Sequence, residues 1–244
     1  MVLSIILVML VMIAGFFIIY ALLPTLVLRP FCFRGYRRQT AKGETAYCAL
    51  TFDDGPNPVY TPRLLDLLQR YGVHATFFVV GTHAGRYPQL LKRMQRDAHQ
   101  IATHHERHIS NWFLSPRATA DQCRQATQTV AAITGERPVY YRPPWGHLNL
   151  FFLRSTRDFR PVLWSAILGD WRSALGSQRL AKRIREHLHD GAIICLHDDG
   201  ENPGANDDAP ENTLKALEAV LPEAIKHYTF VTVDALYQIS KQKA

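Results

Sequence analysis

The sequence TFDDGP at residues 51–56 places two adjacent carboxylates, Asp53 and Asp54, where an apolar, strand-like run breaks into a Gly-Pro turn. One carboxylate can bind a divalent cation while its neighbour takes a proton from a water molecule beside that cation. Asp, Gly and Pro also favour turns for local conformational reasons, so the motif alone fits a simple turn equally well. The rest of the chain has to decide between these interpretations.

Around this motif, strand-like and helix-like segments alternate along the chain. The apolar runs of strand length are residues 46–52, 75–80, 99–102, 139–141, 161–164, 192–196 and 229–233, of which 99–102 is the weakest. Helical periodicity covers residues 62–71, 88–96, 116–134, 177–189 and 212–227. Regular alternation favours parallel strands covered by helices. About seven strands favour a barrel over an open sheet, and the absence of a glycine-rich dinucleotide-binding motif after the first strand weakens the alternative of a Rossmann fold. We therefore predict a distorted (β/α) barrel of about seven parallel strands.

The first 28 residues carry no charged side chain and are almost wholly apolar. This run exceeds the roughly 20 residues that cross a bilayer as a helix. A cleavable signal peptide would show a positive amino-terminal region, a shorter apolar core and a small-x-small cleavage site. We therefore predict an uncleaved, single-pass transmembrane anchor at residues 1–28, a basic juxtamembrane linker at 29–45 and one globular domain at 46–240.

The net charge of +7 is concentrated directly after the apolar run. Five basic residues stand there with no acid among them, leaving +2 for the rest of the chain; they are Arg29, Arg34, Arg37, Arg38 and Lys42. Such a cluster suits anionic lipid head groups, and the globular part has no basic stripe that would indicate nucleic-acid binding. By the positive-inside rule the same cluster favours a cytoplasmic domain.

Two other features predict no site. The four cysteines are far apart and fit neither a zinc-ligand spacing nor a disulfide framework; they are Cys32, Cys48, Cys123 and Cys195. The polar loop at residues 198–212 does not match a calcium-binding EF-hand, so we interpret it as a solvated loop.

Four further groups of reactive residues follow predicted strands. His104 and His108 are four residues apart, which on one helical turn brings both imidazoles to the same side, and His105 between them could compete as a ligand. Arg142 precedes two prolines, an arrangement that holds a guanidinium rigidly enough to orient a carboxylate. Surface histidines and a Pro-rich turn are the ordinary alternatives.

The last two groups lie nearer the carboxyl end. Trp164 is followed by Asp170 and Trp171, which could form an aromatic wall or belong to the core. His197 emerges from the apolar run 192–196, a position suited to proton transfer near neutral pH. All five groups stand at or just beyond the carboxyl ends of predicted strands, which is the functional face of an α/β barrel.

In this order the motifs resemble those of the NodB-homology polysaccharide deacetylases, the carbohydrate esterase family 4. They are TFDDGP, His104-x3-His108, Arg142-Pro143-Pro144-Trp145, Asp170-Trp171 and Leu196-His197, and the resemblance spans about residues 46–240. It implies a metal-dependent hydrolase that removes N-acetyl groups from amino sugars of a polysaccharide, a cell-envelope glycan or a lipid-linked glycan. It also implies an extracytoplasmic catalytic domain, against the charge rule.

The resemblance assigns a role to each motif residue. Asp54, His104 and His108 would hold the divalent metal, usually zinc, and Asp53 would be the general base, oriented by Arg142. His197 would be the general acid with Asp170 as its partner. Substrate binding would fall to Trp145 through its backbone N–H, and to Trp171, Cys195 and Leu196 around the acyl group.

Two departures bear on the acyl group. Residues 165–169 lack the aspartates that the family often has there, and Cys195 stands where a leucine commonly lines the acetyl pocket. Removal of formyl or another small acyl group is therefore an alternative. A different class, a carbohydrate-binding or scaffolding protein on the same fold, would be expected to lack one or more of the chemical groups, and all are present.

Overall fold

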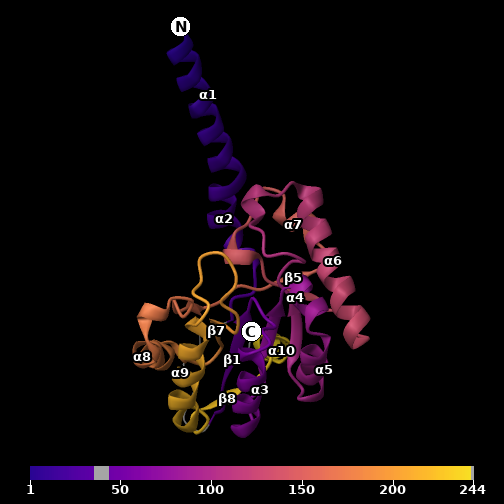
Figure 1. Cartoon of the computed structure of the whole chain (residues 1–244), viewed down its shortest axis with the longest axis vertical. Helices are drawn as coiled ribbons and strands as arrows, with labels where there is room; N and C mark the ends of the chain where they lie inside the picture. Colours follow the sequence, from indigo (N-terminus) through magenta and orange to yellow (C-terminus); the bar gives the residue numbers. More distant parts are fainter. Residues whose placement is uncertain (36–43, 243–244) are drawn as a thin grey trace.

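The computed structural model describes residues 1–35 and 44–242, so Arg37, Arg38 and Lys42 of the predicted basic cluster lie outside it. An apolar helix projects from one end of an α/β domain (Figure 1). The domain is built on one parallel sheet whose strands are β1 (Ala46–Asp53), β2 (Thr76–Val79), β3 (Gln100–Thr103), β4 (Tyr140–Tyr141), β5 (Arg160–Pro161), β6 (Ala166–Ile167), β7 (Ala192–His197) and β8 (Tyr228–Phe230). Seven of them follow in the order β5-β4-β3-β2-β1-β7-β6, and β8 pairs with the first residues of β1.

Helices connect and cover these strands. They are α3 (Tyr60–Arg70), α4 (Gly81–Arg86), α5 (Pro88–Arg96), α6 (Pro116–Thr134), α7 (Phe152–Ser155), α8 (Ser177–His187), α9 (Ala209–Ala224) and α10 (Val233–Gln242). Local chemistry sets the ends of α6: the Ser115 hydroxyl accepts a hydrogen bond from the Ala118 N–H, and Gly135 takes the left-handed conformation after the last turn. The predicted helices at 88–96 and 116–134 have these same bounds, whereas the short helices α4 and α7 were not predicted.

Alternation along β1 separates the two faces of the sheet. Cys48, Leu50 and Phe52 point outward into the main hydrophobic core under α3 and α9. Ala49 packs inside the curve of the sheet, and Thr51 and Asp53 share its face because side chains alternate along a strand. The last inward position of β1 is therefore a carboxylate.

The sheet curls into a partial barrel, confirming the predicted fold class, but β5 and β6 do not pair with each other. Phe33 lies at the β5 edge instead: its N–H donates to the Pro161 carbonyl at 2.9 Å, and its carbonyl accepts from the Leu163 N–H at 2.8 Å. The strand predicted at 161–164 is thus shifted to β5, and β6 was not predicted.

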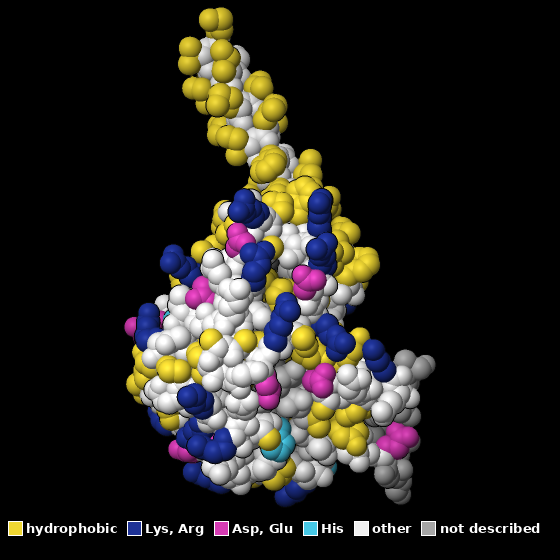
Figure 2. Space-filling view, turned by 90° about the vertical axis from the view of Figure 1, so that its right-hand side faces the viewer, with side chains coloured by type: hydrophobic (Ala, Val, Ile, Leu, Met, Phe, Trp, Pro, Cys, Tyr) yellow, Lys and Arg dark blue, Asp and Glu magenta, His cyan; other side chains and the backbone are white. Residues whose placement is uncertain are grey.

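The amino-terminal helix runs without interruption through α1 (Val2–Phe17), a π-helical turn at Ile18–Leu22, α2 (Leu23–Leu28) and a 3-10 turn at Arg29–Phe31. Over its 30 residues it is long and apolar enough to cross a membrane. Hydrophobic side chains cover its projecting part (Figure 2). Ala21 and Thr25, in contrast, are buried against the domain.

Candidate metal centre and active site

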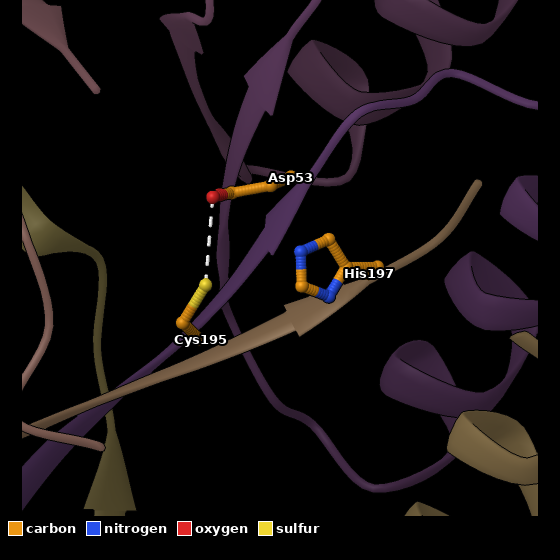
Figure 3. Close-up of side chains that lie close together, drawn as sticks. All are labelled: Asp53, Cys195 and His197. Atoms are coloured by element: carbon orange, nitrogen blue, oxygen red, sulfur yellow. Dashed lines mark hydrogen bonds between the residues drawn. The ribbon is translucent and has the colours of Figure 1, made fainter. Parts of the chain in front are cut away.

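Strand register brings the reactive groups of β1 and β7 face to face. Asp53 pairs with His197 and Thr51 with Cys195, so all four side chains share the inner face of the sheet. One ligand atom each of Asp53, Cys195 and His197 lie within 4.8 Å of one another. Figure 3 shows the His197 ring beside these two side chains.

Asp54 turns away from Asp53 toward two histidines. It has a positive φ of 81°, a conformation that non-glycine residues seldom adopt and that occurs where a site demands it. Its Oδ1 lies 3.3 Å from His104 Nε2 and 3.2 Å from His108 Nε2. This oxygen is buried and lacks a hydrogen-bond partner among the described residues. The predicted triad therefore does come together.

Hydrogen bonding fixes how the histidines present their rings. His104 Nδ1 lies 2.7 Å from the Arg142 carbonyl, which can only accept, so Nδ1 carries the proton and Nε2 offers its lone pair to the site. His105 points elsewhere, because its Nδ1 lies 2.9 Å from the Ile109 carbonyl and its Nε2 lies 2.6 Å from the Tyr141 hydroxyl. His105 therefore does not compete for the site.

The protonation states suit a cation. Burial lowers the pKa of His108 to about 4, so its imidazole is neutral at neutral pH. Burial opposes ionisation of Asp54, but the imidazoles of His108 and His104 outweigh it and hold the pKa of that carboxyl below its usual range. An orphaned buried carboxylate oxygen facing two imidazole nitrogens is the donor set that divalent zinc and similar ions take.

Asp53 is held by a fully buried arginine. Arg142 Nη1 donates to Asp53 Oδ1 at 2.6 Å and to Thr51 Oγ1 at 2.8 Å, while Nη2 and Nε donate to the carbonyls of Leu163 and Val162 at 3.0 and 3.3 Å. A guanidinium with its donors occupied in this way has one position. Arg142 therefore fixes the direction in which Asp53 presents its second oxygen.

That second oxygen, Oδ2, accepts a hydrogen bond from the Cys195 thiol at 3.4 Å (Figure 3). Burial raises the pKa of Cys195 well above its usual value, so the thiol keeps its proton. With Asp53 already paired to Arg142 and Cys195 protonated, this group is unsuited to a second metal ion. All four cysteines are free and buried.

His197 is coupled to a buried carboxylate. Its Nδ1 lies 3.0 Å from Asp170 Oδ1, and its backbone N–H donates to Asp170 Oδ2 at 2.7 Å. Thr213 Oγ1 donates to the same Oδ2 at 3.2 Å. Burial opposes a charged ring, but Asp170 outweighs burial and raises the pKa of His197 to about 10. His197 is thus an imidazolium held over the pocket.

These groups open into a pocket of about 270 Å³. Trp145 and Trp171 line it, with the Trp145 ring 4.1 Å from that of His108 and the Trp171 ring 5.6 Å from that of His197. Leu196 does not: it follows Cys195 by one position, so it points to the opposite face and packs in the main core. The assignment of Leu196 to substrate binding is therefore wrong.

Other residues at the site were not predicted. His147 and Ile167 line the pocket together with Asn202, Pro203, Gly204 and Ala205 of the loop interpreted above as solvated. In the same loop, Asp198 is buried and accepts a hydrogen bond from Thr61 Oγ1 at 2.5 Å. Burial raises the pKa of Asp198 to about 7. The only sequence signal for this loop was its acid-rich stretch directly after His197.

Comparison with known proteins shows that the chain has relatives of similar sequence. A family model for polysaccharide deacetylases matches residues 40–159. The chain is 32% identical over 207 residues to a peptidoglycan-N-acetylglucosamine deacetylase of Bacillus cereus, covering 83% of this chain and 93% of that protein. It is also 32% identical over 207 residues to the peptidoglycan-N-acetylmuramic acid deacetylase PdaC of Bacillus subtilis, covering 85% of this chain but only 42% of that protein.

Solved structures show the same likeness. A family 4 acetyl xylan esterase from Clostridium thermocellum, in complex with a cobalt ion, superposes with a TM-score of 0.71 at 29% identity. The match covers 79% of this chain and 91% of that one.

Proposed function

Because the chain belongs to the polysaccharide deacetylase family, we propose that it is a metal-dependent hydrolase that removes N-acetyl groups from the amino sugars of a cell-envelope glycan. One observation carries this proposal. The two adjacent carboxylates face different partners, Asp54 the imidazoles of His104 and His108, and Asp53 the guanidinium of Arg142. A turn without chemical function would have no reason to separate them.

Asp54, His104 and His108 would hold the divalent ion, for which we propose zinc. When bound, the ion supplies a Lewis acid that polarises the acyl carbonyl. Beside this site, Asp53 accepts a proton from the attacking water, with Arg142 fixing its carboxylate. The backbone N–H of Trp145 is our candidate donor to the oxygen that becomes negatively charged.

His197 completes the reaction by donating a proton to the departing amine nitrogen. Asp170 keeps the ring charged and oriented, so the proton is available at neutral pH. The reaction is balanced by the side chains alone: Asp53 takes one proton from water and His197 gives one to the amine. Trp171 lines the pocket and would border the acyl group, whereas Cys195 is fully buried against Asp53 Oδ2 and does not line the pocket.

We further propose that residues 1–28 anchor the protein in a membrane and that the domain lies on the extracytoplasmic side, where envelope glycan is found. The relatives named for peptidoglycan support this side. The basic residues after the helix favour the other side, so topology is a direct check on the substrate.

The proposal is tested with the full chain in detergent. Acetate release from N-acetylated chitooligosaccharide and peptidoglycan fragments should require a divalent ion, disappear on chelation and return with zinc. His104→Ala should lose both bound metal and turnover, whereas the variant His227→Ala, which removes an exposed histidine paired with Glu223, should keep both. Metal-independent turnover would contradict the proposed function.

A further inference from the structure

The last turns of the amino-terminal helix are part of the folded domain. Buried Thr25 Oγ1 accepts hydrogen bonds from Trp112 Nε1 at 2.8 Å and from the Leu148 N–H at 3.0 Å. The Tyr20 hydroxyl donates to the Leu114 carbonyl at 2.5 Å. Removing the helix would leave these groups without partners, at a cost that a discarded signal peptide does not impose. The helix therefore stays with the mature domain.

The helix docks at the edge of the sheet that carries the reactive groups. Trp112 belongs to the loop that follows β3, and Leu148 belongs to the loop that follows β4. All strands are parallel, so both loops lie at the carboxyl edge, beside the pocket. The helix consequently leaves the domain from its catalytic end (Figure 1).

A row of aromatic rings joins the helix to the metal-ligand candidates. The Phe17 ring lies 5.6 Å from Trp112, which stacks on His147 at 3.6 Å and an interplanar angle of 9°. His147 lies 5.9 Å from Trp145, and Trp145 lies 4.1 Å from His108. The pocket wall and the helix are thus one packed unit rather than two bodies on a flexible tether.

The contacts between the helix and the domain set the height of the membrane surface. About 20 residues cross the hydrocarbon core, and α1 has no buried residue. Phe17 and Tyr20 contact the domain, so the membrane surface lies near these two residues. Leu23 and Leu26, which follow Tyr20 in the helix, are still 50% and 70% exposed. Because the exposed side of the helix stays apolar here, no water-exposed segment separates the membrane from the domain.

The domain presents an apolar rim at the same height, formed by Phe113, Leu150, Phe151 and Leu153. These side chains are 76%, 49%, 39% and 40% exposed. The Phe113 ring lies 6.3 Å from Phe17, and Phe151 lies 6.3 Å from Tyr20, so the rim continues the surface of the helix. Hydrophobic side chains gather around the base of the helix, with Lys and Arg beside them (Figure 2).

This pattern matches the interface of a bilayer. Aromatic side chains concentrate where hydrocarbon meets head groups, and exposed apolar patches of this kind mark contact with another phase. Arg154 and Arg157, which follow Leu153, are exposed and could approach anionic head groups. The occupant of the rim is therefore lipid, continuous with the lipid around the helix.

We propose that the helix and the apolar rim seat the mouth of the catalytic pocket against the bilayer, and that the substrate is an N-acetylated amino sugar attached to a membrane lipid. The inference rests on the deacetylase function proposed above. A sugar carried by a lipid arrives at the height of the pocket, whereas a polymer strand would have to pass between the domain and the membrane. The pocket, at about 270 Å³, lies near the lower end of the roughly 300–1,000 Å³ typical of small-ligand sites.

Seating is measured first, without any enzyme assay. The four native cysteines are buried, so Phe113→Cys can be labelled with a nitroxide in the full chain. Ile225→Cys is the matched control, since Ile225 is also exposed but precedes β8 at the opposite edge of the sheet. In phosphatidylcholine–phosphatidylglycerol vesicles, the nitroxide at position 113 should be more accessible to oxygen than to a water-soluble nickel chelate. The nitroxide at position 225 should show the reverse. Equal, water-like access at both positions would overturn the seating.

Substrate class is measured next, with a synthetic N-acetylglucosaminyl lipid in the same vesicles and a soluble chitooligosaccharide. The double variant Phe113→Ser, Phe151→Ser should lower kcat/KM for the glycolipid by about tenfold and leave the soluble substrate within about twofold. Ile225→Ser should change neither. A wild type that acts on the soluble substrate without preferring the glycolipid would overturn this inference alone, whereas no activity on either would overturn the proposed function.

Discussion

Asp53→Asn tests the division of labour between the adjacent carboxylates. The amide keeps the shape and an oxygen for Arg142 Nη1, 2.6 Å away, but removes the only carboxylate paired with that buried guanidinium among the described residues. Neutralising one partner of a buried ion pair costs about 3–5 kcal/mol. Because Arg142 keeps its bonds to Thr51, Val162 and Leu163, we expect a loss near the lower end, about 3 kcal/mol of unfolding free energy.

The catalytic loss should be larger than this stability loss suggests. A general base contributes about 10²–10⁴-fold, so turnover should fall by that factor while bound metal stays at the wild-type level. The measurements are chemical unfolding in detergent with the ion present, metal content per chain, and initial rates of acetate release. Asp121→Asn is the matched control: this carboxylate on α6 pairs with the exposed Arg124 at 2.7 Å, and its loss should change stability by less than about 1 kcal/mol.

Three results would refute the reasoning. Retained turnover in Asp53→Asn would remove Asp53 from its role as base. An emptied metal site in the same variant would show that the two carboxylates act as one ligand group. A stability equal to that of the wild type would mean that Arg142 does not depend on Asp53 for its charge balance.

Other predictions concern the metal, the acid and pH. Asp54→Asn should lower metal affinity by at least about tenfold without unfolding the domain, checked by metal titration with circular dichroism; a filled site would contradict the triad. Asp170→Asn should move the alkaline limb of the pH–rate profile to lower pH, because the carboxylate raises the pKa of His197 to about 10 and its loss lets His197 deprotonate sooner; an unmoved limb would argue against His197 as the acid. Burial lowers the pKa of His99 to about 4, below its unfolded value of about 6.5. The contribution of the neutral, buried ring to the free energy of unfolding is therefore complete above about pH 6.5 and declines by up to about 3 kcal/mol as the pH falls toward 4. In His99→Gln this decline of stability with falling pH should be smaller, as measured by unfolding curves at successive pH values. The same decline in the variant as in the wild type would contradict the assignment to His99.

The fold class and most of the site could be predicted because their signals are local. Asp53, Asp54 and His197 end apolar runs, and parallel strands bring such ends to one edge. Strand β6 could not be predicted, since two residues carry no periodicity and their pairing with β7 depends on a distant part of the chain. Leu196 was assigned to substrate binding from the Leu196-His197 motif of the resemblance, but alternation along β7 turns its side chain into the main core.

The position of the amino-terminal helix also lay beyond the sequence. Apolar composition predicts burial but does not distinguish lipid from protein as the surroundings, so the run 1–28 could not show that Thr25 is buried in the domain. The same holds for His147, whose place in the pocket depends on stacking with Trp112 from another loop. Contacts between loops of different strands leave no spacing pattern in the chain.

The pairing of Phe33 with the β5 edge has a practical consequence for how the protein can be handled. A chain shortened to begin at Ala46 would lose the backbone partner of Pro161 and Leu163, so the β5 edge would be left with unpaired peptide groups. Exposed strand edges pair readily with one another. Shortened soluble forms should therefore self-associate. Their aggregation would result from the loss of the Phe33 segment at the β5 edge rather than from an unstable enzyme.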